Sequence, residues 1–305
     1  MEEHVGIGVD LGGTSIKYGL VNTKSDIIWS SKKPTPAKIS RDEIVQNICE
    51  AILEALQMAK MLNLKVVSVG VGTPGLVKDK NMVLGAADNL ADWENVPLGS
   101  LIESQVRLPT FIANDADMMA TGEFSKFGFV DETLLFFTLG TGIGGALIIK
   151  GELFQGHYGM GGELGMFPMI INGEVLNWED VASTSAMVRL YQEQCDNGLK
   201  DKIDGKRIVQ LFLEGQPLAV QVVEQVSTYI ALGISGYVNA LNPSKIIIGG
   251  GISSAGEFFI DMIRSKVAEF ALKESLENVS IEGAKLGNSA GFVGAAIYSL
   301  KHSKY

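Results

Sequence analysis

Two glycine-rich segments, one in each half of the chain, follow apolar strands and lead directly into further strands. The first is GIGVDLGGTSIK at residues 6–17, and the second is FFTLGTGIGGALII at residues 136–149. Because glycine has no Cβ, its backbone adopts positive φ easily and its N–H groups can approach an anion closely. The pair predicts two related lobes, each holding the phosphates of a nucleotide with a β-turn-β loop.

The second segment also matches the G-x-G-x-x-G pattern of dinucleotide-binding folds, at Gly140, Gly142 and Gly145. That motif requires a helix directly after the glycines. Residues 146–149 instead favour a strand, and the next turn signal follows at once at residues 150–152. We therefore predict a hairpin and exclude the dinucleotide fold. Ordinary glycine-rich hairpins that bind no ligand are the alternative.

The composition restricts the class of protein. The chain has 305 residues, enough for two domains, and a net charge of −10 from 25 basic and 35 acidic residues. An acidic surface repels nucleic acid and anionic membranes, so neither is an expected partner. Cys49 and Cys195 lack the spacing of a disulfide scaffold or a cysteine zinc site. With no targeting leader and no apolar run of about 20 residues, a soluble cytoplasmic protein is expected.

Apolar patterns of strand and helix type alternate along the chain, which predicts an α/β architecture. Residues 40–43 form a capping-box sequence, and Ile44, Ile48 and Ile52 give the next helix an apolar face. A short strand then ends at residues 114–115, and a helix is expected from about residue 117 to 127. We place the lobe boundary here. The predicted division is a small N-terminal lobe (1–115), a large C-terminal lobe (116–289), and a last helix (290–305) that packs back on the first lobe.

Six short motifs occur in order along the chain. They are DLGGT at 10–14, GTPG at 72–75, ND at 114–115, LGTGIGG at 139–145, GGELG at 161–165 and GGGI at 249–252. This succession resembles the ROK family of sugar kinases, repressors and open reading frames, over nearly the whole chain. The resemblance implies an α/β actin/hexokinase-like (ribonuclease H-like) two-lobed fold with a cleft between the lobes, and an ATP- and Mg²⁺-dependent sugar kinase.

The resemblance places the catalytic base at Asp115, which would accept the proton of the sugar hydroxyl that attacks the γ-phosphate. The dipeptide alone fits equally a helix cap, since Asn and Asp are favoured at that position. Asp10 is expected near Mg²⁺, in direct contact or through water, because Mg²⁺ prefers carboxylate and phosphate oxygens. Lys17 could face the phosphates or could be an exposed strand lysine.

Other residues are expected to bind the nucleotide and the sugar. For the phosphates these are Gly12, Gly13, Thr14, Gly140, Thr141 and Gly142, and for the adenosine Gly249, Gly250 and Gly251, where a helix N-terminus follows. A tight strand-to-helix turn is the alternative for that glycine run. For the sugar the family implies Gly75, Asn89, Asn114, Asp115, Glu163 and Glu179, whose carboxylates and amides suit vicinal hydroxyls.

The chain departs from the family pattern at one segment. Most members carry a His after the Gly-Glu-x-Gly motif and then a cysteine cluster that holds a structural zinc. Here the His position is Met166, and residues 172–179 contain no cysteine, so we predict no zinc site. Glu179 is retained, and Trp178 and Phe167 could hold the loop by apolar packing. Glucose is the default substrate, and a β-glucoside, N-acetylmannosamine or another hexose is the alternative.

Two other classes of function are alternatives to the kinase. A sugar-responsive repressor of the same family would carry a DNA-binding segment before the first strand, whereas here only about four residues precede it. A sugar-binding regulator without catalysis fits the missing cysteine cluster but not the retained Asp115 and phosphate loops. A homodimer is common in the family, although no interface can be recognised in the sequence.

Overall fold

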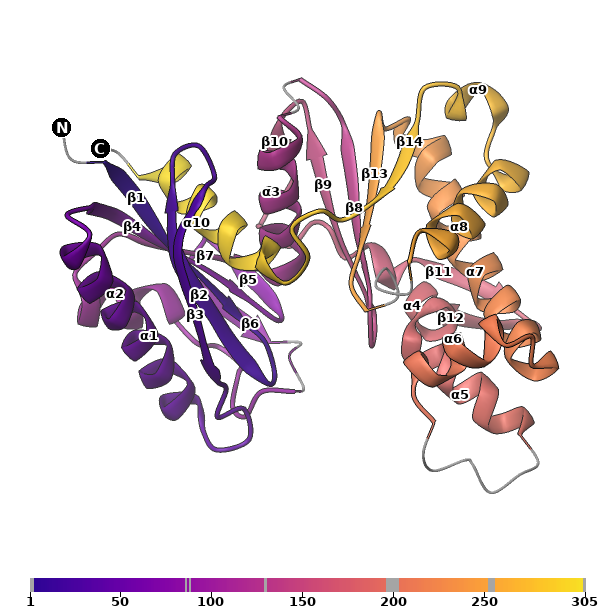
Figure 1. The fold of residues 1–305 in the computed structure, drawn as a ribbon, viewed down its shortest axis with the longest axis horizontal. Coiled ribbons are helices and arrows are strands. Elements are labelled where there is room, and N and C mark those ends of the chain that lie inside the picture. Colours follow the sequence, from indigo (N-terminus) through magenta and orange to yellow (C-terminus); the bar gives the residue numbers. More distant parts are fainter. Residues whose placement is uncertain are drawn as a thin grey trace. The chain divides into compact units, whose positions relative to one another are not determined.

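The computed structural model describes residues 3–85, 87, 89–128, 131–195, 203–251 and 256–303. The chain divides into two units (Figure 1). The first unit comprises Met1–Val130, Leu153–Gly161 and Leu286–Tyr305, and the second comprises Asp131–Glu152 and Gly162–Lys285. The first division along the chain therefore falls at 130/131 and not at the expected 115/116.

The first unit contains a five-stranded sheet, which includes the predicted N-terminal hairpin and the strands that follow it in the sequence. Its strand order is β3-β2-β1-β4-β7. Strands β1 and β2 form the predicted antiparallel hairpin, with Leu11 opposite Ile16, whereas β4 runs parallel to both β1 and β7. The bounds are β1 His4–Leu11, β2 Ser15–Asn22, β3 Ile27–Pro34, β4 Lys65–Thr73 and β7 Thr110–Asn114.

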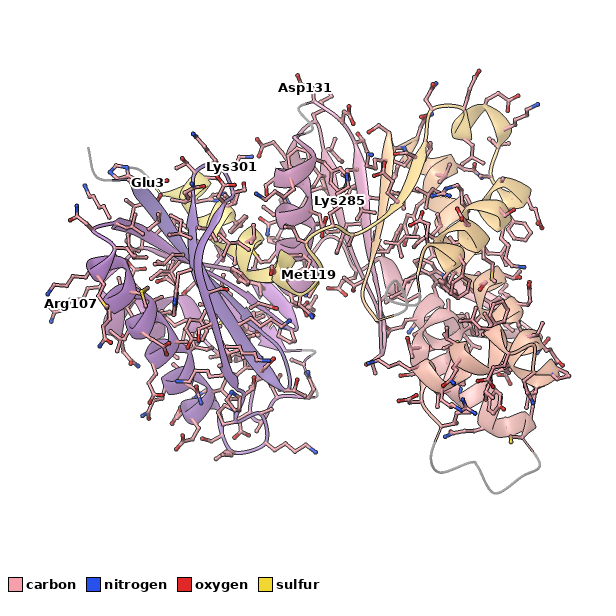
Figure 2. The ribbon with its side chains drawn as sticks, in the orientation of Figure 1. Glu3, Arg107, Met119, Asp131, Lys285 and Lys301 are labelled. Atoms are coloured by element: carbon pink, nitrogen blue, oxygen red, sulfur yellow. The ribbon has the colours of Figure 1, made fainter. Side chains whose placement is uncertain are left out.

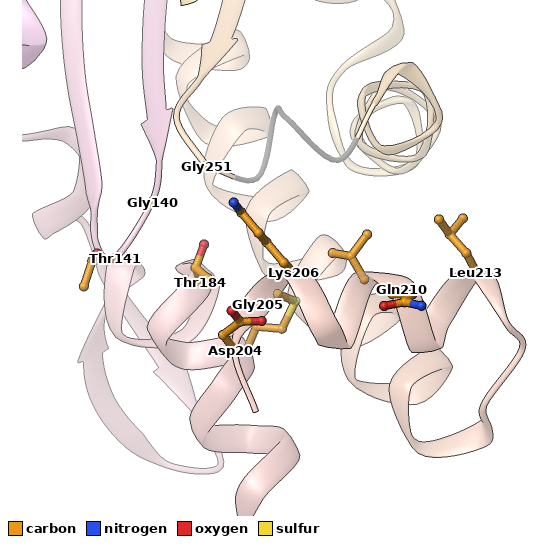
Figure 3. A pocket seen from close by; sticks show the side chains of 11 residues that line it. Gly140, Thr141, Thr184, Asp204, Gly205, Lys206, Gln210, Leu213 and Gly251 are labelled. Atoms are coloured by element: carbon orange, nitrogen blue, oxygen red, sulfur yellow. The ribbon is translucent and has the colours of Figure 1, made fainter. Parts of the chain in front are cut away.

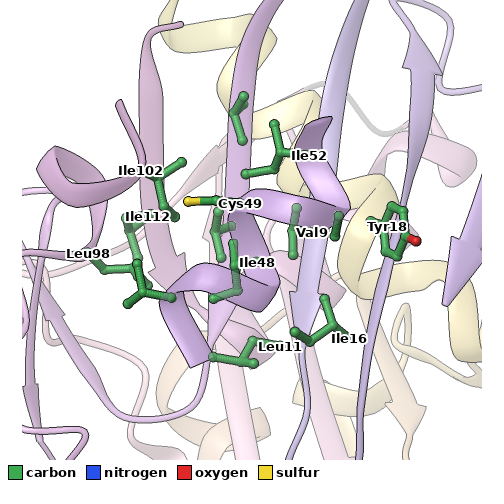
Figure 4. Packing of buried hydrophobic residues seen from close by; sticks show 14 of the residues in the cluster. Val9, Leu11, Ile16, Tyr18, Ile48, Cys49, Ile52, Leu98, Ile102 and Ile112 are labelled. Carbon is green, nitrogen blue, oxygen red and sulfur yellow. The ribbon is translucent and has the colours of Figure 1, made fainter. Parts of the chain in front are cut away.

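Helices α1 (Arg41–Met61) and α2 (Leu98–Val106) cover one face of this sheet (Figure 1). The hydroxyl of Ser40 accepts a hydrogen bond from the Glu43 N–H at 3.2 Å, so Ser40 is the expected N-cap of α1. Ile48 and Ile52 pack with Val9 in the core between helix and sheet (Figure 4). At the far end of α2, Arg107 adopts a left-handed conformation, and its side chain points away from the sheet (Figure 2).

Helix α10 (Ala290–His302) lies on the opposite face, in direct contact with the strand backbones. A Cβ on Gly8 would overlap the carbonyl group of Phe292, and one on Gly70 would overlap that of Ala295. Side chains at these positions would push the helix off the sheet. The alternation of small and apolar residues in β1 therefore reflects two faces, one packed by side chains and one packed by a helix backbone.

Helix α3 (Asp115–Phe127) crosses α10 just as closely, which explains why it belongs to the first unit. A Cβ on Gly294 would overlap the carbonyl group of Met118, and one on Gly122 would overlap the Ala290 carbonyl oxygen. The expected boundary did not include this crossing, because the two glycines are far apart in the sequence.

The segment 153–161 belongs to the same unit. There, Gln155 donates a hydrogen bond to Asp117 (3.4 Å) and accepts one from Tyr298 (3.1 Å). A small hairpin completes the unit, β5 Leu76–Lys78 with β6 Met82–Gly85.

The second unit has its own five-stranded sheet, with the order β10-β9-β8-β13-β14. Strands β8 and β9 form the second predicted hairpin, and a strand rather than a helix follows its glycines, as expected. Strand β13 runs parallel to β8 and β14. The bounds are β8 Leu134–Leu139, β9 Ile143–Ile149, β10 Glu152–Leu153, β13 Lys245–Gly249 and β14 Ser280–Gly283.

Helices and a further hairpin surround this sheet, and α7 and α8 pack against each other in its core. They are α4 Trp178–Ala182, α5 Thr184–Gln194, α6 Gly205–Leu213, α7 Pro217–Leu241, α8 Glu257–Phe270 and α9 Lys273–Leu276. The hairpin is β11 Pro168–Ile171 with β12 Glu174–Asn177, and the 3-10 turns are η1 Leu164–Met166 and η3 Gly287–Ser289.

The prediction that no apolar run approaches the length of a membrane span was wrong. Among the described residues, α7 is long and apolar enough to cross a membrane by length and composition alone. Residues along its whole length, among them Val223, Ile230 and Val238, are buried in the core of the second unit. The apolar character of α7 is therefore accounted for by its position as a core helix.

The helix crossing predicts a difference between two glycine-to-alanine substitutions. Gly294→Ala should lower the stability of the protein by about 1–3 kcal/mol, because its methyl group meets the backbone of α3. The exposed Gly236 of α7 has open space around its Cβ position, and Gly236→Ala should be neutral or stabilising by up to about 1 kcal/mol. Thermal unfolding of both variants measures the difference. Equal midpoints would contradict the close α3–α10 contact.

Candidate functional site

The first group of predicted residues lies at one edge of the sheet in the first unit. Strands β1, β4 and β7 are parallel, with Asp10 in register with Gly72 and Thr73 in register with Asn114. Because the carboxyl ends of parallel strands meet at the same edge, the residues that follow them are brought together there. Asp10, Gly75, Asn114 and Asp115 all belong to this edge.

Asp10 is buried, with 4% of its surface exposed, and its carboxylate contacts Lys17. The two residues face each other across β1 and β2, and Lys17 Nζ lies 3.1 Å from Asp10 Oδ2. A Cβ on Gly291 would lie 2.6 Å from the Asp10 carboxyl carbon, so the carboxylate sits against the first turn of α10. Burial raises the pKa of Asp10, and the Lys17 ammonium partly offsets that rise. Lys17 is therefore a partly exposed strand lysine that forms an ion pair with a buried carboxylate.

The turn Gly12-Gly13-Thr14 is held from outside by the chain that follows β3. Thr35 Oγ1 donates to Gly12 O at 2.7 Å, and the Thr35 N–H donates to Thr14 O at 3.1 Å. Asn89 approaches the turn from the other side, with its Nδ2 2.8 Å from the position of a Gly13 Cβ. A predicted sugar residue thus lies beside the predicted phosphate turn.

Asn89 owes its place to Trp93, whose buried indole fixes the segment to the end of β4. Trp93 Nε1 donates to Thr73 Oγ1 at 2.9 Å. The hydrogen bond joins this segment to the residues that lead into Gly75. Ala86 and Asp88, which flank the same segment, lie outside the described residues.

Asn114 has the helix-capping role that the sequence offered as one of its two interpretations. Its Oδ1 accepts from the Ala116 N–H at 2.8 Å, which makes it the N-cap of α3. Its Nδ2 donates to Gly75 O at 3.1 Å, where Gly75 takes a positive φ of 94° that favours glycine. Asp115 is the first residue of α3 and is half-buried, so α3 begins two residues earlier than expected.

The second group of predicted residues surrounds the β8–β9 turn in the second unit. Gly140 N–H donates to Gly142 O at 3.0 Å within the turn, and Gly140 O accepts from the Thr184 N–H at 2.8 Å. Strand β13 ends beside this turn, and Gly250, with φ of 86°, lies directly on the backbone of Leu139. The two glycine segments, far apart in sequence, therefore meet. Ile252, the last residue of the GGGI motif, lies outside the described residues.

A cavity of about 780 Å³ opens where these two segments meet (Figure 3). Three predicted residues line it, and Gly249 and Gly250 support it without lining it. Helices α5 and α6 supply the opposite wall, which was not predicted from the sequence. The lining is Gly140, Thr141, Thr184, Met187, Asp204, Gly205, Lys206, Val209, Gln210, Leu213 and Gly251.

Polar groups on the missed wall are suited to a nucleotide. Thr184 Oγ1 is buried without a hydrogen-bond partner in the described part of the chain. Asp204 caps α6 by accepting from the Arg207 N–H at 2.8 Å, and Lys206 extends from the first turn of α6 into the cavity (Figure 3). No ion pair engages Lys206 among the described residues. The cap sequence Asp204-Gly205-Lys206 was a helix-start signal that could have drawn attention to this wall.

Glu163 and Glu179 lie close together in the second unit. Glu179 Oε2 accepts from the Ile143 N–H at 3.1 Å, next to Gly142 of the β8–β9 turn. Desolvation and the Glu179 carboxylate raise the pKa of Glu163. Two carboxyl groups in this arrangement would gain from hydroxyl donors such as those of a sugar. Met166 is the last residue of η1 and is exposed, and no cluster of three potential metal ligands is found in the described ranges.

Comparisons with known proteins identify relatives along nearly the whole chain. A sequence model of the ROK family matches residues 6–302. The glucokinase of Streptomyces coelicolor is 33% identical over 312 residues, covering 95% of this chain and 96% of that protein. The beta-glucoside kinase of Listeria innocua is 27% identical over 298 residues, covering 96% of each.

A solved structure extends the similarity to three dimensions. A ROK family glucokinase from Streptomyces griseus, in complex with glucose and AMPPNP, superposes with a TM-score of 0.82 at 32% identity, covering 97% of this chain and 99% of that one. The fold is therefore the actin/hexokinase-like two-lobed α/β fold that the motifs implied. The chain belongs to the ROK family.

Proposed function

We propose that this protein is an ATP-dependent sugar kinase that transfers the γ-phosphate of ATP to a hydroxyl of a hexose. The observation that carries the proposal is the cavity of the second unit, where the β8–β9 turn, the glycine run 249–251 and Lys206, which has no ion pair among the described residues, converge. Its volume suits a nucleoside. The similarity to a glucokinase that binds glucose and AMPPNP supports the same function.

The nucleotide would bind through the second unit. The adenosine would occupy the cavity against Gly251, and backbone N–H groups of the β8–β9 turn, with Thr141 and Lys206, would contact the phosphates. The turn Gly12-Gly13-Thr14 of the first unit would supply further donors to the phosphates. Backbone groups and a single lysine allow an acidic protein to bind an anion.

Asp115 would act as the general base in a direct transfer. It would accept the proton of the attacking hydroxyl, while Gly75, Asn89, Asn114, Glu163 and Glu179 orient the sugar ring. Asn114 fixes the start of α3 and therefore the backbone of Asp115. Most of the rate gain in phosphoryl transfer comes from such alignment and from charge stabilisation.

Glucose with transfer to its 6-hydroxyl is the first candidate substrate. A β-glucoside is the second, because the exposed Met166 stands where the family carries a histidine and a beta-glucoside kinase is among the relatives. N-acetylmannosamine is a third.

We also propose a cytoplasmic location, because the two cysteines are buried and free, as is usual in a reducing compartment. We further propose a homodimer of the kind common in the family.

Removing the base tests the catalytic assignment. With MgATP and a panel of glucose, cellobiose and N-acetylmannosamine, the wild-type protein should form ADP in a sugar-dependent manner. Asp115→Asn should lower kcat by about 10²–10⁴-fold, the usual contribution of a general base. The exposed Asp131→Asn serves as a control and should keep the wild-type rate. If the wild-type protein turns over none of these sugars, the proposed kinase function is refuted. If Asp115→Asn keeps near-full activity, the assignment of Asp115 as the general base is refuted.

The cavity lysine gives a second test. Lys206→Met should raise KM for ATP about tenfold, equivalent to about 1.4 kcal/mol, because one contact to a phosphate is lost. KM for the sugar should stay unchanged. The neighbouring Arg207 pairs with Glu214 outside the cavity, so Arg207→Met is the matched control. A rise in the sugar KM alone would show that the cavity does not bind the nucleotide.

The residues present fit a magnesium ion held mainly by phosphate and water. Asp10 supplies one buried carboxylate at the sheet edge, and Mg²⁺ in such sites commonly uses one or two protein carboxylates. When bound, the ion would offset the negative charge of the phosphates. Asp10→Asn should therefore raise the Mg²⁺ concentration for half-maximal rate about tenfold, with a similar rate at saturating Mg²⁺. An unchanged Mg²⁺ requirement would exclude Asp10 from this role.

A further inference from the structure

Trp178 is fully buried, although it begins a helix of only five residues beside an exposed hairpin. Its indole lies on the bare backbone of α7 at Gly233, where a Cβ would overlap the ring. One turn earlier in α7, Tyr229 O accepts a hydrogen bond from Trp178 Nε1 at 2.8 Å. The glycine and the carbonyl together form a socket that fits an indole in one orientation.

Aromatic neighbours close this socket. The Phe137 ring of β8 meets the Trp178 ring edge-on, with 5.4 Å between centroids and an interplanar angle of 89°. Tyr237 of α7 packs against both rings, with its centroid 6.1 Å from that of Trp178 and 5.8 Å from that of Phe137. Edge-on pairs of this kind add to the stabilisation from burial alone. The start of α4 is thus attached to both the central strand and the core helix of the second unit.

The same group of aromatic residues holds the segment that carries Glu163. The Tyr237 hydroxyl donates to Leu164 O at 2.7 Å, directly after Glu163. The Trp178 N–H donates to Phe167 O at 2.8 Å, at the end of η1. Both glutamate-bearing segments are therefore anchored to one rigid cluster.

Glu179 follows Trp178 directly and reaches the β8–β9 turn. Its Oε2 accepts from the Ile143 N–H at 3.1 Å and lies 2.5 Å from the position of a Gly142 Cβ, so a side chain at position 142 would displace this carboxylate. No hydrogen bond engages Oε1 in the part of the chain that the structure describes. One carboxylate oxygen therefore fixes the residue to the phosphate turn, and the other is available for a ligand.

We propose that Trp178 is a positioning residue, which holds the Glu179 carboxylate against the β8–β9 turn and so presents its second oxygen to the sugar. This inference rests on the proposed function, in which Glu179 binds the sugar. The indole does not touch the substrate. It acts through the rigid attachment of α4 to α7 and β8.

Kinetics of Trp178→Phe test the proposal. The variant keeps an aromatic ring but loses the hydrogen bond to Tyr229 O and part of the contact with Gly233. The sugar KM should rise about tenfold, whereas kcat should change by less than about threefold. Trp29→Phe, at a half-buried position of β3 in the first unit, is the matched control and should leave both constants unchanged.

A double-mutant cycle separates positioning from general destabilisation. In a Glu179→Gln background, Trp178→Phe should cause no further rise in the sugar KM, because the residue it positions is already altered. A merely structural role would give additive effects in the cycle, which would overturn the inference. An unchanged sugar KM in Trp178→Phe would also overturn it.

A milder variant covers the case in which Trp178→Phe does not fold. Tyr237→Phe removes only the hydroxyl bond to Leu164 O and should raise the sugar KM about threefold, again without a further effect in the Glu179→Gln background. An unchanged sugar KM in Tyr237→Phe, or an additive effect in the Glu179→Gln background, would contradict the inference that the aromatic cluster positions the glutamates. Wild-type protein that turns over no sugar would refute the proposed function itself, and this inference with it.

Discussion

Direct contact between backbones, at positions where glycine leaves no side chain, is the constraint on which both units depend. In the first unit, α10 lies on β1 and β4 at Gly8 and Gly70 and crosses α3 at Gly294. In the second, Gly250 lies on the end of β8. Protein interiors are close-packed, so a methyl group at such a point displaces a whole element. The positions of Asp10 and Asp115 follow from the first set of contacts, and the cavity follows from the second.

The electrostatics of the site are local, which resolves the apparent conflict between an acidic chain and an anionic ligand. The net charge of −10 is spread over the whole molecule. The cavity itself presents backbone turns, a buried hydroxyl at Thr184, the ammonium group of Lys206, and one carboxylate, Asp204, which accepts a hydrogen bond as the cap of α6. At short range these groups outweigh distant surface carboxylates, because salt screens exposed charges beyond about 10 Å. The negative charge of Asp10, in turn, is paired with the ammonium group of Lys17 in the same sheet.

Local sequence patterns predicted the elements that carry the site well. The two hairpins, the Ser40 cap, the strand before Asn114 and the helix at 290–302 depend on neighbours in the chain, which the sequence displays directly. The boundary at 115/116 failed because the α3–α10 crossing joins Gly122 to Gly294, and neither glycine stands out alone. The wall formed by α5 and α6 was missed for a similar reason, since Thr184 and Lys206 come near Gly140 only after three separate segments have packed.

The sequence by itself determined the two glycine turns, the acidic character and the family, because these depend on residue type and order. Tertiary structure alone decided which residues complete the site. It placed Asn89 beside Gly13, seated Trp178 on Gly233, and joined Glu179 to the β8–β9 turn. Each of these contacts joins residues more than 30 positions apart, and its existence depends on the shape of the surfaces that meet. A one-dimensional pattern records the chemistry of a side chain, whereas its neighbours are set by the packing of the whole unit.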